Sequence, residues 1–215
     1  MNLWTRYILA LLLFVATFLF TDYLELSRIL SFLIAFGVIL LVFLPSFYVL
    51  LFGSDIKKIE KVLISYRDEP VFNLYLALAN NDNEEVEYCI EAILNKHKAR
   101  HKQALYKTIL ALYKKEILSA KEEIKLIKPL IYQNYYQAFL YIEEGNTLGA
   151  IKLIDTLPKQ WMRDILLSEI KFRSGQYDEA LKLGRQALEQ VRGITKYSAY
   201  KSYQKQLLEY GNYVS

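Results

Sequence analysis

The two histidines of the chain, His97 and His101, are four residues apart, a spacing that can place two imidazoles on one metal ion. No third ligand is evident nearby, and the surrounding lysine and arginine residues disfavour a bound cation. We therefore predict no metal site. We expect His101 to lie partly buried beside Leu105.

The other reactive side chains form no catalytic pattern. Cys89, the single cysteine, stands among apolar neighbours without a histidine partner, which predicts a small buried hydrophobe in a reducing compartment. Acid pairs such as Glu122 with Glu123 and Glu143 with Glu144 are adjacent, so they point apart on a helix. No glycine-rich phosphate loop or nucleophile motif occurs. We predict a protein that is not an enzyme and has no cofactor; an enzyme whose site follows no motif is an alternative.

The most basic stretch runs from Lys96 to Lys102 and could contact anionic lipid headgroups, RNA or an acidic partner through Lys98, Arg100 and Lys102. Its charges are distributed around a helix and no aromatic residues alternate with them, which favours a solvated junction between helices. A domain that binds RNA or anionic lipid is a second alternative.

Charge divides the chain into two regions. The first 53 residues hold four of its 50 charged side chains, and apolar residues run through 7–20 and again through 29–52. Twenty-four helical residues reach roughly 36 Å, enough to cross a hydrocarbon layer about 30 Å thick. The sequence predicts a transmembrane helical hairpin over 1–53, with spans at about 4–22 and 29–52. No small-residue cleavage pair follows Phe20, which disfavours a signal peptide.

The distribution of basic residues predicts the orientation of this hairpin. The connector between the spans carries Arg28 alone, whereas Lys57, Lys58, Lys61 and Arg67 follow the second span closely. By the positive-inside tendency, both termini should lie in the cytoplasm. We therefore expect a multi-pass protein of the cell (plasma or inner) membrane, with residues 54–215 as a cytoplasmic domain.

Residues 54–215 show apolar positions at three- and four-residue spacing, separated by short polar turns, which predicts an all-α domain. The expected helices cover about 55–68, 70–80, 83–95, 98–115, 119–130, 132–144, 147–157, 160–174, 177–191 and 194–211. The turns between paired helices fall near 80–83, 115–118, 145 and 175. This period of a little over 30 residues is typical of stacked helix hairpins, about four in number, with helix 55–68 and the last helix closing the two ends.

The stretch around Gly175 carries more detail. Ser168 and Phe172 precede this glycine, and Ala180 and Ala187 follow it seven residues apart on one helix face. Gly175 suits a left-handed helix end, and the two alanines allow a close approach of helices. This stretch resembles the tetratricopeptide repeat, although Gly184 stands where that family usually has an aromatic residue.

The resemblance implies a tetratricopeptide-like α-solenoid whose first helices line a concave, ligand-holding groove. The groove residues that it implies are Tyr132, Tyr135, Phe139, Ile165, Glu169, Phe172 and Arg173. We therefore expect a membrane-anchored adaptor or scaffold whose repeats capture a protein or peptide at the inner membrane surface. A larger membrane complex, recognised also by the spans, is a variant of this hypothesis; nucleic acid and small-molecule substrates fit less well.

Overall fold

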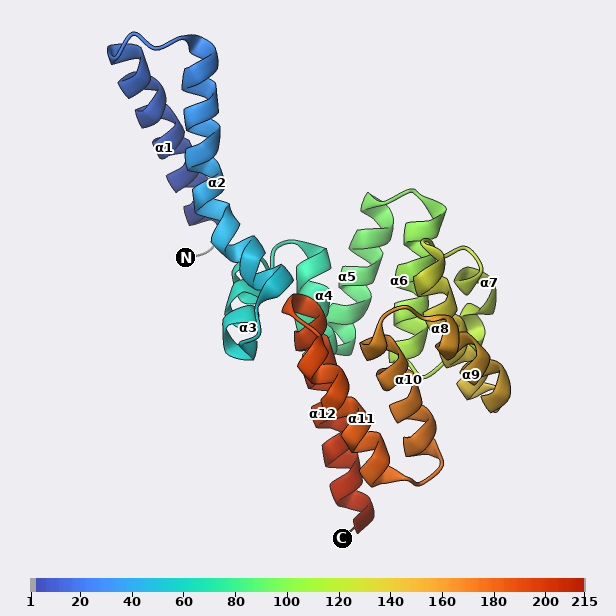
Figure 1. Ribbon diagram of the computed structural model, residues 1–215. Coiled ribbons are helices and arrows are strands. Elements are labelled where there is room, and N and C mark those ends of the chain that lie inside the picture. Colours follow the sequence, from blue (N-terminus) through green and yellow to red (C-terminus); the bar gives the residue numbers. More distant parts are fainter. Residues whose placement is uncertain (1–2, 215) are drawn as a thin grey trace.

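The computed structural model describes residues 3–214, and the side chains of residues 4–208, as a succession of helices (Figure 1). No strand occurs within residues 3–214, so the all-α prediction is confirmed. The helices are α1 (Leu3–Tyr23), α2 (Arg28–Phe52), α3 (Ile56–Ser65), α4 (Pro70–Asn80), α5 (Asn83–Lys96), α6 (Arg100–Tyr113), the 3-10 turn η1 (Ile117–Ala120), α7 (Lys121–Ile124), α8 (Leu130–Glu143), α9 (Thr147–Thr156), α10 (Gln160–Arg173), α11 (Tyr177–Gln190) and α12 (Gly193–Val214).

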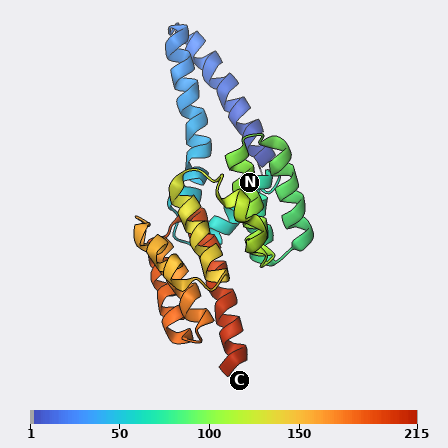
Figure 2. The ribbon, with the colours of Figure 1, turned by 90° about the vertical axis from the view of Figure 1, so that its right-hand side faces the viewer.

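Helices α1 and α2 form a hairpin that projects from the rest of the molecule (Figures 1 and 2). Ala10 and Ala35 are buried between them, and the rings of Phe18 and Phe32 meet edge to face with centroids 5.3 Å apart. Both helices are long and apolar enough to cross a membrane. Only 11% and 17% of their most apolar stretches are buried inside the protein, which distinguishes them from the core helices of a soluble domain.

The following helices pack as four consecutive hairpins: α4 with α5, α6 with η1 and α7, α8 with α9, and α10 with α11. Each hairpin turns at a residue in the left-handed region: Asn81, Lys115, Gly145 and Gly175, with φ of 54°, 60°, 73° and 76°. Because a backbone at positive φ ends a helix and frees the chain to reverse, these four positions set the period. All four fall within or beside the turns predicted from the sequence.

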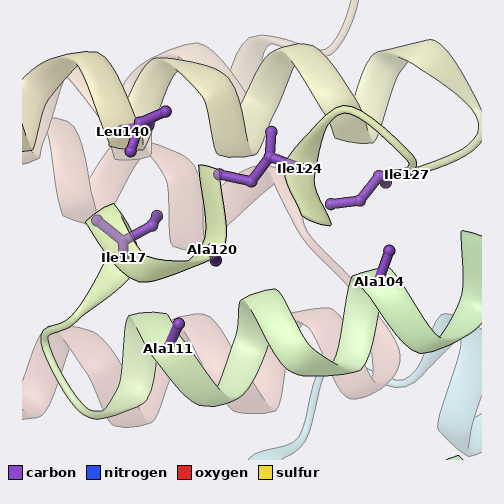
Figure 3. Packing of buried hydrophobic residues seen from close by; sticks show 7 residues of the cluster. All are labelled: Ala104, Ala111, Ile117, Ala120, Ile124, Ile127 and Leu140. Atoms are coloured by element: carbon purple, nitrogen blue, oxygen red, sulfur yellow. The ribbon is translucent and has the colours of Figure 1, made fainter. Parts of the chain in front are cut away.

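The predicted helix over 119–130 is wrong. The chain makes the 3-10 turn η1 and the single turn α7, and helical structure resumes only at Leu130. Pro129 explains the break, because the residue before a proline avoids helical geometry. Apolar side chains nevertheless fill the space of a second helix: Figure 3 shows Ile117, Ala120, Ile124 and Ile127 between Ala104 and Ala111 of α6 and Leu140 of α8.

The α10–α11 hairpin packs closely for the reasons seen in its sequence. Ala180 and Ala187 are buried, and the hydroxyl of Ser168 donates to the carbonyl oxygen of Ala180 at 2.8 Å. Gly184 admits a ring from the next helix, because a Cβ there would lie 2.8 Å from Cδ2 of Tyr203. An aromatic residue is therefore present in this region, contributed by α12.

Helix α12 does not close a distant end of the array. It packs against α11 and also against α2, α3 and α4, so the two helices expected to cap opposite ends lie against each other. The hydroxyl of Tyr197 donates to Oε1 of Glu60 on α3 at 2.9 Å, and Nζ of Lys201 lies 3.2 Å from the same oxygen. This long-range pairing has no local signature in the sequence.

The same region joins the hairpin to the domain. Leu50, in the last turn of α2, is buried in a core cluster with Ile59, Leu63, Leu76 and Tyr197. The amide of Gly193 donates to the carbonyl oxygen of Gly53 at 2.7 Å. A second link lies nearer the start of α1, where Nη1 of Arg6 donates to Oγ of Ser46 and, at 3.2 Å, to the hydroxyl of Tyr66. Hairpin and domain are therefore joined by packed contacts.

Candidate partner-binding surface

Four tyrosines from three helices lie close enough for their hydroxyl groups to interact electrostatically. They are Tyr75 of α4, Tyr106 of α6, and Tyr132 and Tyr136 of α8, here called the tyrosine cluster. Burial raises the pKa of Tyr75 to about 12, and the neighbouring hydroxyls of Tyr106 and Tyr132 add to the rise. Burial and the other three hydroxyls also raise the pKa of Tyr136. Tyr75 and Tyr136 therefore stay neutral, as donors and acceptors, at physiological pH.

The tyrosine cluster is partly open to solvent. Tyr132 is 37% exposed, and the other three side chains are half-buried. None of the four hydroxyls has a hydrogen-bond partner among residues 4–208. A buried phenol normally finds such a partner, so these groups retain unused hydrogen-bonding capacity beside apolar ring surface.

A second group of side chains lies between α8 and α10. The ring of Tyr135 packs edge to face on Phe139 at 5.2 Å between centroids, and lies 6.2 Å from that of Trp161. Burial, followed by the nearby Tyr136 and Glu169, raises the pKa of Tyr135. Glu169 in turn accepts a hydrogen bond of 2.7 Å from Nε of Arg173.

The structure brings together most of the residues expected in the groove, in two groups. Tyr132 belongs to the tyrosine cluster, whereas Tyr135, Phe139, Glu169 and Arg173 form the group between α8 and α10. Nη2 of Arg173 also pairs with Glu143 at 2.6 Å, which ties the ends of α8 and α10 together.

Two of the expected residues lie elsewhere on α10. Phe172 packs edge to face on Tyr177 of α11 at 5.1 Å between centroids, so it serves the contact within its own hairpin. Ile165 is half-buried on α10. Whether any of these residues contacts a partner stays a prediction.

Sequence reasoning missed Tyr75 and Tyr106 as site residues. The signal was present, because Tyr75, Tyr106 and Tyr136 are 31 and 30 residues apart, which is the period of the hairpins. The prediction considered aromatic residues clustered on a single helix and therefore missed tyrosines that recur from one hairpin to the next. The same residue type at the same position of consecutive repeats must face the same side of a stack.

The basic stretch is exposed at the junction of α5 and α6. Lys98, Arg100 and Lys102 face solvent and make no ion pair within residues 4–208. A depression of about 630 Å³ opens beside them, lined by His101, Lys125, Ile127, Lys128, Pro129, Leu130 and Gln133. His101 is half-buried, as expected.

The helix break between α5 and α6 separates the two histidines. His97 follows the end of α5 and His101 lies in the first turn of α6, so they do not share one helical face. In the described part of the chain, no three His, Cys, Asp or Glu side chains group closely enough to hold a metal ion.

Cys89 lies in the core of the α4–α5 hairpin and is fully buried. Burial, together with the adjacent Glu85 carboxylate, raises the pKa of its thiol to about 11. Because the thiolate is the reactive form, Cys89 is protected both by packing and by electrostatics.

Comparison with known proteins adds no family assignment. No family model, curated protein or solved structure matches the chain. The geometry of the two groups of side chains and of the hairpin therefore carries the functional argument.

Proposed function

We propose that this chain is a membrane-anchored adaptor that holds a protein or peptide partner near the inner membrane surface. In this proposal the α1–α2 hairpin crosses the membrane twice and leaves both termini in the cytoplasm. The four helix hairpins form a tetratricopeptide-like stack, and the first helix of each hairpin faces the partner. The lack of ionisable side chains in the central turns of α1 and α2 supports anchorage over transport.

The observation that carries the proposal is the tyrosine cluster. Its hydroxyls come from the first helices of three consecutive hairpins and have no protein partner among residues 4–208. An extended peptide presents unpaired amide N–H and C=O groups together with alternating side chains. Phenol groups can pair with such a backbone while their rings cover the apolar side chains, which is why tyrosine is frequent at recognition surfaces.

The group between α8 and α10 supplies charge at one end of this surface. Glu143, Glu169 and Arg173 form a network in which one guanidinium serves two carboxylates. Its charged groups are partly exposed, so a partner can exchange ion pairs with them without leaving a buried charge unpaired. We assign this network to partner orientation, and most of the contact area to the tyrosine cluster.

Site-specific photo-cross-linking in intact cells tests the proposal. A photoreactive phenylalanine derivative in place of Tyr132 should give one discrete cross-linked species. The matched control is the same replacement at Tyr88, a more exposed tyrosine on α5, in the outer layer of its hairpin. If the photoreactive residue at position 88 gave the same cross-linked species with equal yield, the assignment of the partner to the surface formed by the first helices would be contradicted.

A triple variant separates hydrogen bonding from packing. Replacing Tyr75, Tyr106 and Tyr136 by phenylalanine keeps the rings and removes three hydroxyls that stabilise nothing within residues 4–208. Each lost hydrogen bond to a partner costs about 0.5–1.5 kcal/mol, so the Tyr132 cross-link should fall about tenfold or more. Thermal unfolding should be unchanged. Undiminished cross-linking in a folded triple variant would show that the hydroxyls do not bind the partner.

A further inference from the structure

The connections between helices alternate between two edges of the domain. Consecutive antiparallel helices place α3–α4, α5–α6, α7–α8, α9–α10 and α11–α12 on one edge, here called the near edge, and the turns α4–α5, α6–η1, α8–α9 and α10–α11 on the opposite, far edge. The near edge lies toward the hairpin, because Gly193 of the α11–α12 connection hydrogen-bonds to Gly53 and Tyr66 of the α3–α4 connection hydrogen-bonds to Arg6. Figures 1 and 2 both show the α5–α6 connection rising to about the level at which α1 begins.

The two edges differ in charge. The near-edge connections, with the helix residue on either side, hold eight lysine or arginine residues and two acids. The same segments of the far edge hold three basic residues and four acids. The excess of positive charge therefore lies on the side of the domain from which the hairpin projects.

Apolar side chains accompany these charges. Leu126 and Leu130 of the α7–α8 connection are 46% and 64% exposed, on either side of the exposed Lys128. Lys128 and His101 line the depression between the starts of α6 and α8. This depression is open because η1 and the short α7 replace a full second helix in the hairpin that begins with α6. Basic residues beside exposed leucines are typical of surfaces that rest on anionic lipid headgroups, where the charges meet phosphates and the apolar groups enter the interface.

Aromatic residues of the hairpin mark the same level. Trp4 and Tyr7 at the start of α1 and Tyr48 near the end of α2 are exposed, as expected of side chains at a membrane interface. Leu50, less than one turn beyond Tyr48, is already part of the domain core. The headgroup region and the near edge are therefore adjacent along the axis of α2.

We propose that the near edge of the domain lies on the anionic surface of the bilayer that the hairpin crosses, with Lys98, Arg100, Lys102 and Lys128 as headgroup contacts. This inference rests on the membrane anchorage in the proposed function and adds a second, electrostatic contact that orients the domain. None of these four side chains forms an ion pair within residues 4–208, so all are available to phosphate groups. The contact should weaken with salt, because the screening length is about 8 Å at physiological ionic strength.

The test uses the full chain in vesicles of equimolar phosphatidylcholine and phosphatidylglycerol. In a Cys89→Ala background, a fluorophore is attached at Ala99→Cys on the near edge or at Ser174→Cys on the far edge. Quenching by lipids that carry a nitroxide on the headgroup should be about twofold or more stronger at position 99. Replacing the four basic residues by glutamine, or raising the salt, should reduce quenching at position 99 to that at position 174.

Matched controls separate specific charges from net charge. A variant with Lys115, Lys152, Lys182 and Arg185 replaced by glutamine loses the same charge at exposed positions elsewhere and should keep the quenching at position 99. Vesicles of phosphatidylcholine alone should give weak quenching at both positions.

Three results would overturn the inference. Equal quenching at both positions in a chain that resists carbonate extraction would refute the near-edge contact and leave the anchor intact. Release of the chain by carbonate would refute the anchor, and with it this orientation. The amount of RNA that co-purifies with the chain gives the third result. If the four-glutamine variant retained less RNA than the parent while quenching stayed unchanged, the near edge would be assigned to a nucleic acid.

Discussion

Replacing Gly193 by alanine should open the joint between α2 and α12. Gly193 has φ of 58°, and an added Cβ would collide with the carbonyl oxygen of Leu50. Gly175 provides a matched control, because its φ is 76° and a Cβ there meets nothing within 4 Å. Both substitutions should cost about 1 kcal/mol for the left-handed backbone, and only Gly193→Ala should displace a neighbour.

The additional cost at Gly193 follows from the contacts that the displacement removes. The hydrogen bond from its amide to Gly53 contributes about 0.5–1.5 kcal/mol. The bond from Tyr197 to the carboxylate of Glu60 contributes about 1.5–3 kcal/mol, as a bond to a charged group. Gly193→Ala should therefore destabilise the joint by about 3–5 kcal/mol in all, against about 1 kcal/mol for Gly175→Ala.

Two measurements on the full chain in detergent micelles examine this difference. Urea unfolding followed by circular dichroism gives the free energy of unfolding of each variant. Hydrogen exchange of the amides in α12 reports the joint directly, and it should accelerate in Gly193→Ala and stay as in the parent in Gly175→Ala. Equal destabilisation by the two substitutions, with α12 protected in both, would refute the assignment of Gly193 to a packed joint.

Three further results are expected. Burial raises the pKa of Glu60, but hydrogen bonds led by that of Tyr197 outweigh it, so the pKa lies below the ordinary 4.5; docking of α12 should be complete above that pH and weaken as the pH falls below it. Near-ultraviolet circular dichroism against pH should show this transition in the parent and not in Glu60→Gln. Cys89 should resist iodoacetamide at neutral pH, because its pKa is about 11 and it is buried, and should react fully in urea; rapid labelling of the native chain by mass spectrometry would contradict this. Lys115→Gly should raise the free energy of urea unfolding by about 0.5–1 kcal/mol by relieving a non-glycine residue at φ of 60°, and the reverse change, Gly145→Lys at φ of 73°, should lower it by a similar amount.

The sequence predicted the parts of the fold that local chemistry determines. Spans of about 4–22 and 29–52 correspond to α1 and α2 within one residue at each end, because the change from charged to apolar composition is abrupt. The turns at Gly145 and Gly175 were recognisable because glycine is the residue that best tolerates positive φ. The helix over 119–130 failed because its apolar spacing was given more weight than Pro129.

Features that depend on distant residues were not predictable in this way. The contact of α12 with α3 joins Tyr197 to Glu60, and neither residue marks the other in the sequence. The candidate site was predicted in part, because Tyr132 and Tyr135 lie on one aromatic helix. The contribution of Tyr75 and Tyr106 emerges only when helices separated by a full repeat are placed side by side.

The last turn of α2 couples the orientation of the α1–α2 hairpin to that of the whole domain. Leu50 belongs to the helix that forms the second apolar span, and it also packs in the core formed with α3, α4 and α12. The hairpin therefore cannot rotate independently of the domain. In a bilayer, the tilt of α2 would then determine the distance of the tyrosine cluster from the membrane surface and the direction in which it faces. Inserting a few glycines between Phe52 and Asp55 would keep the anchor and the domain but remove that alignment.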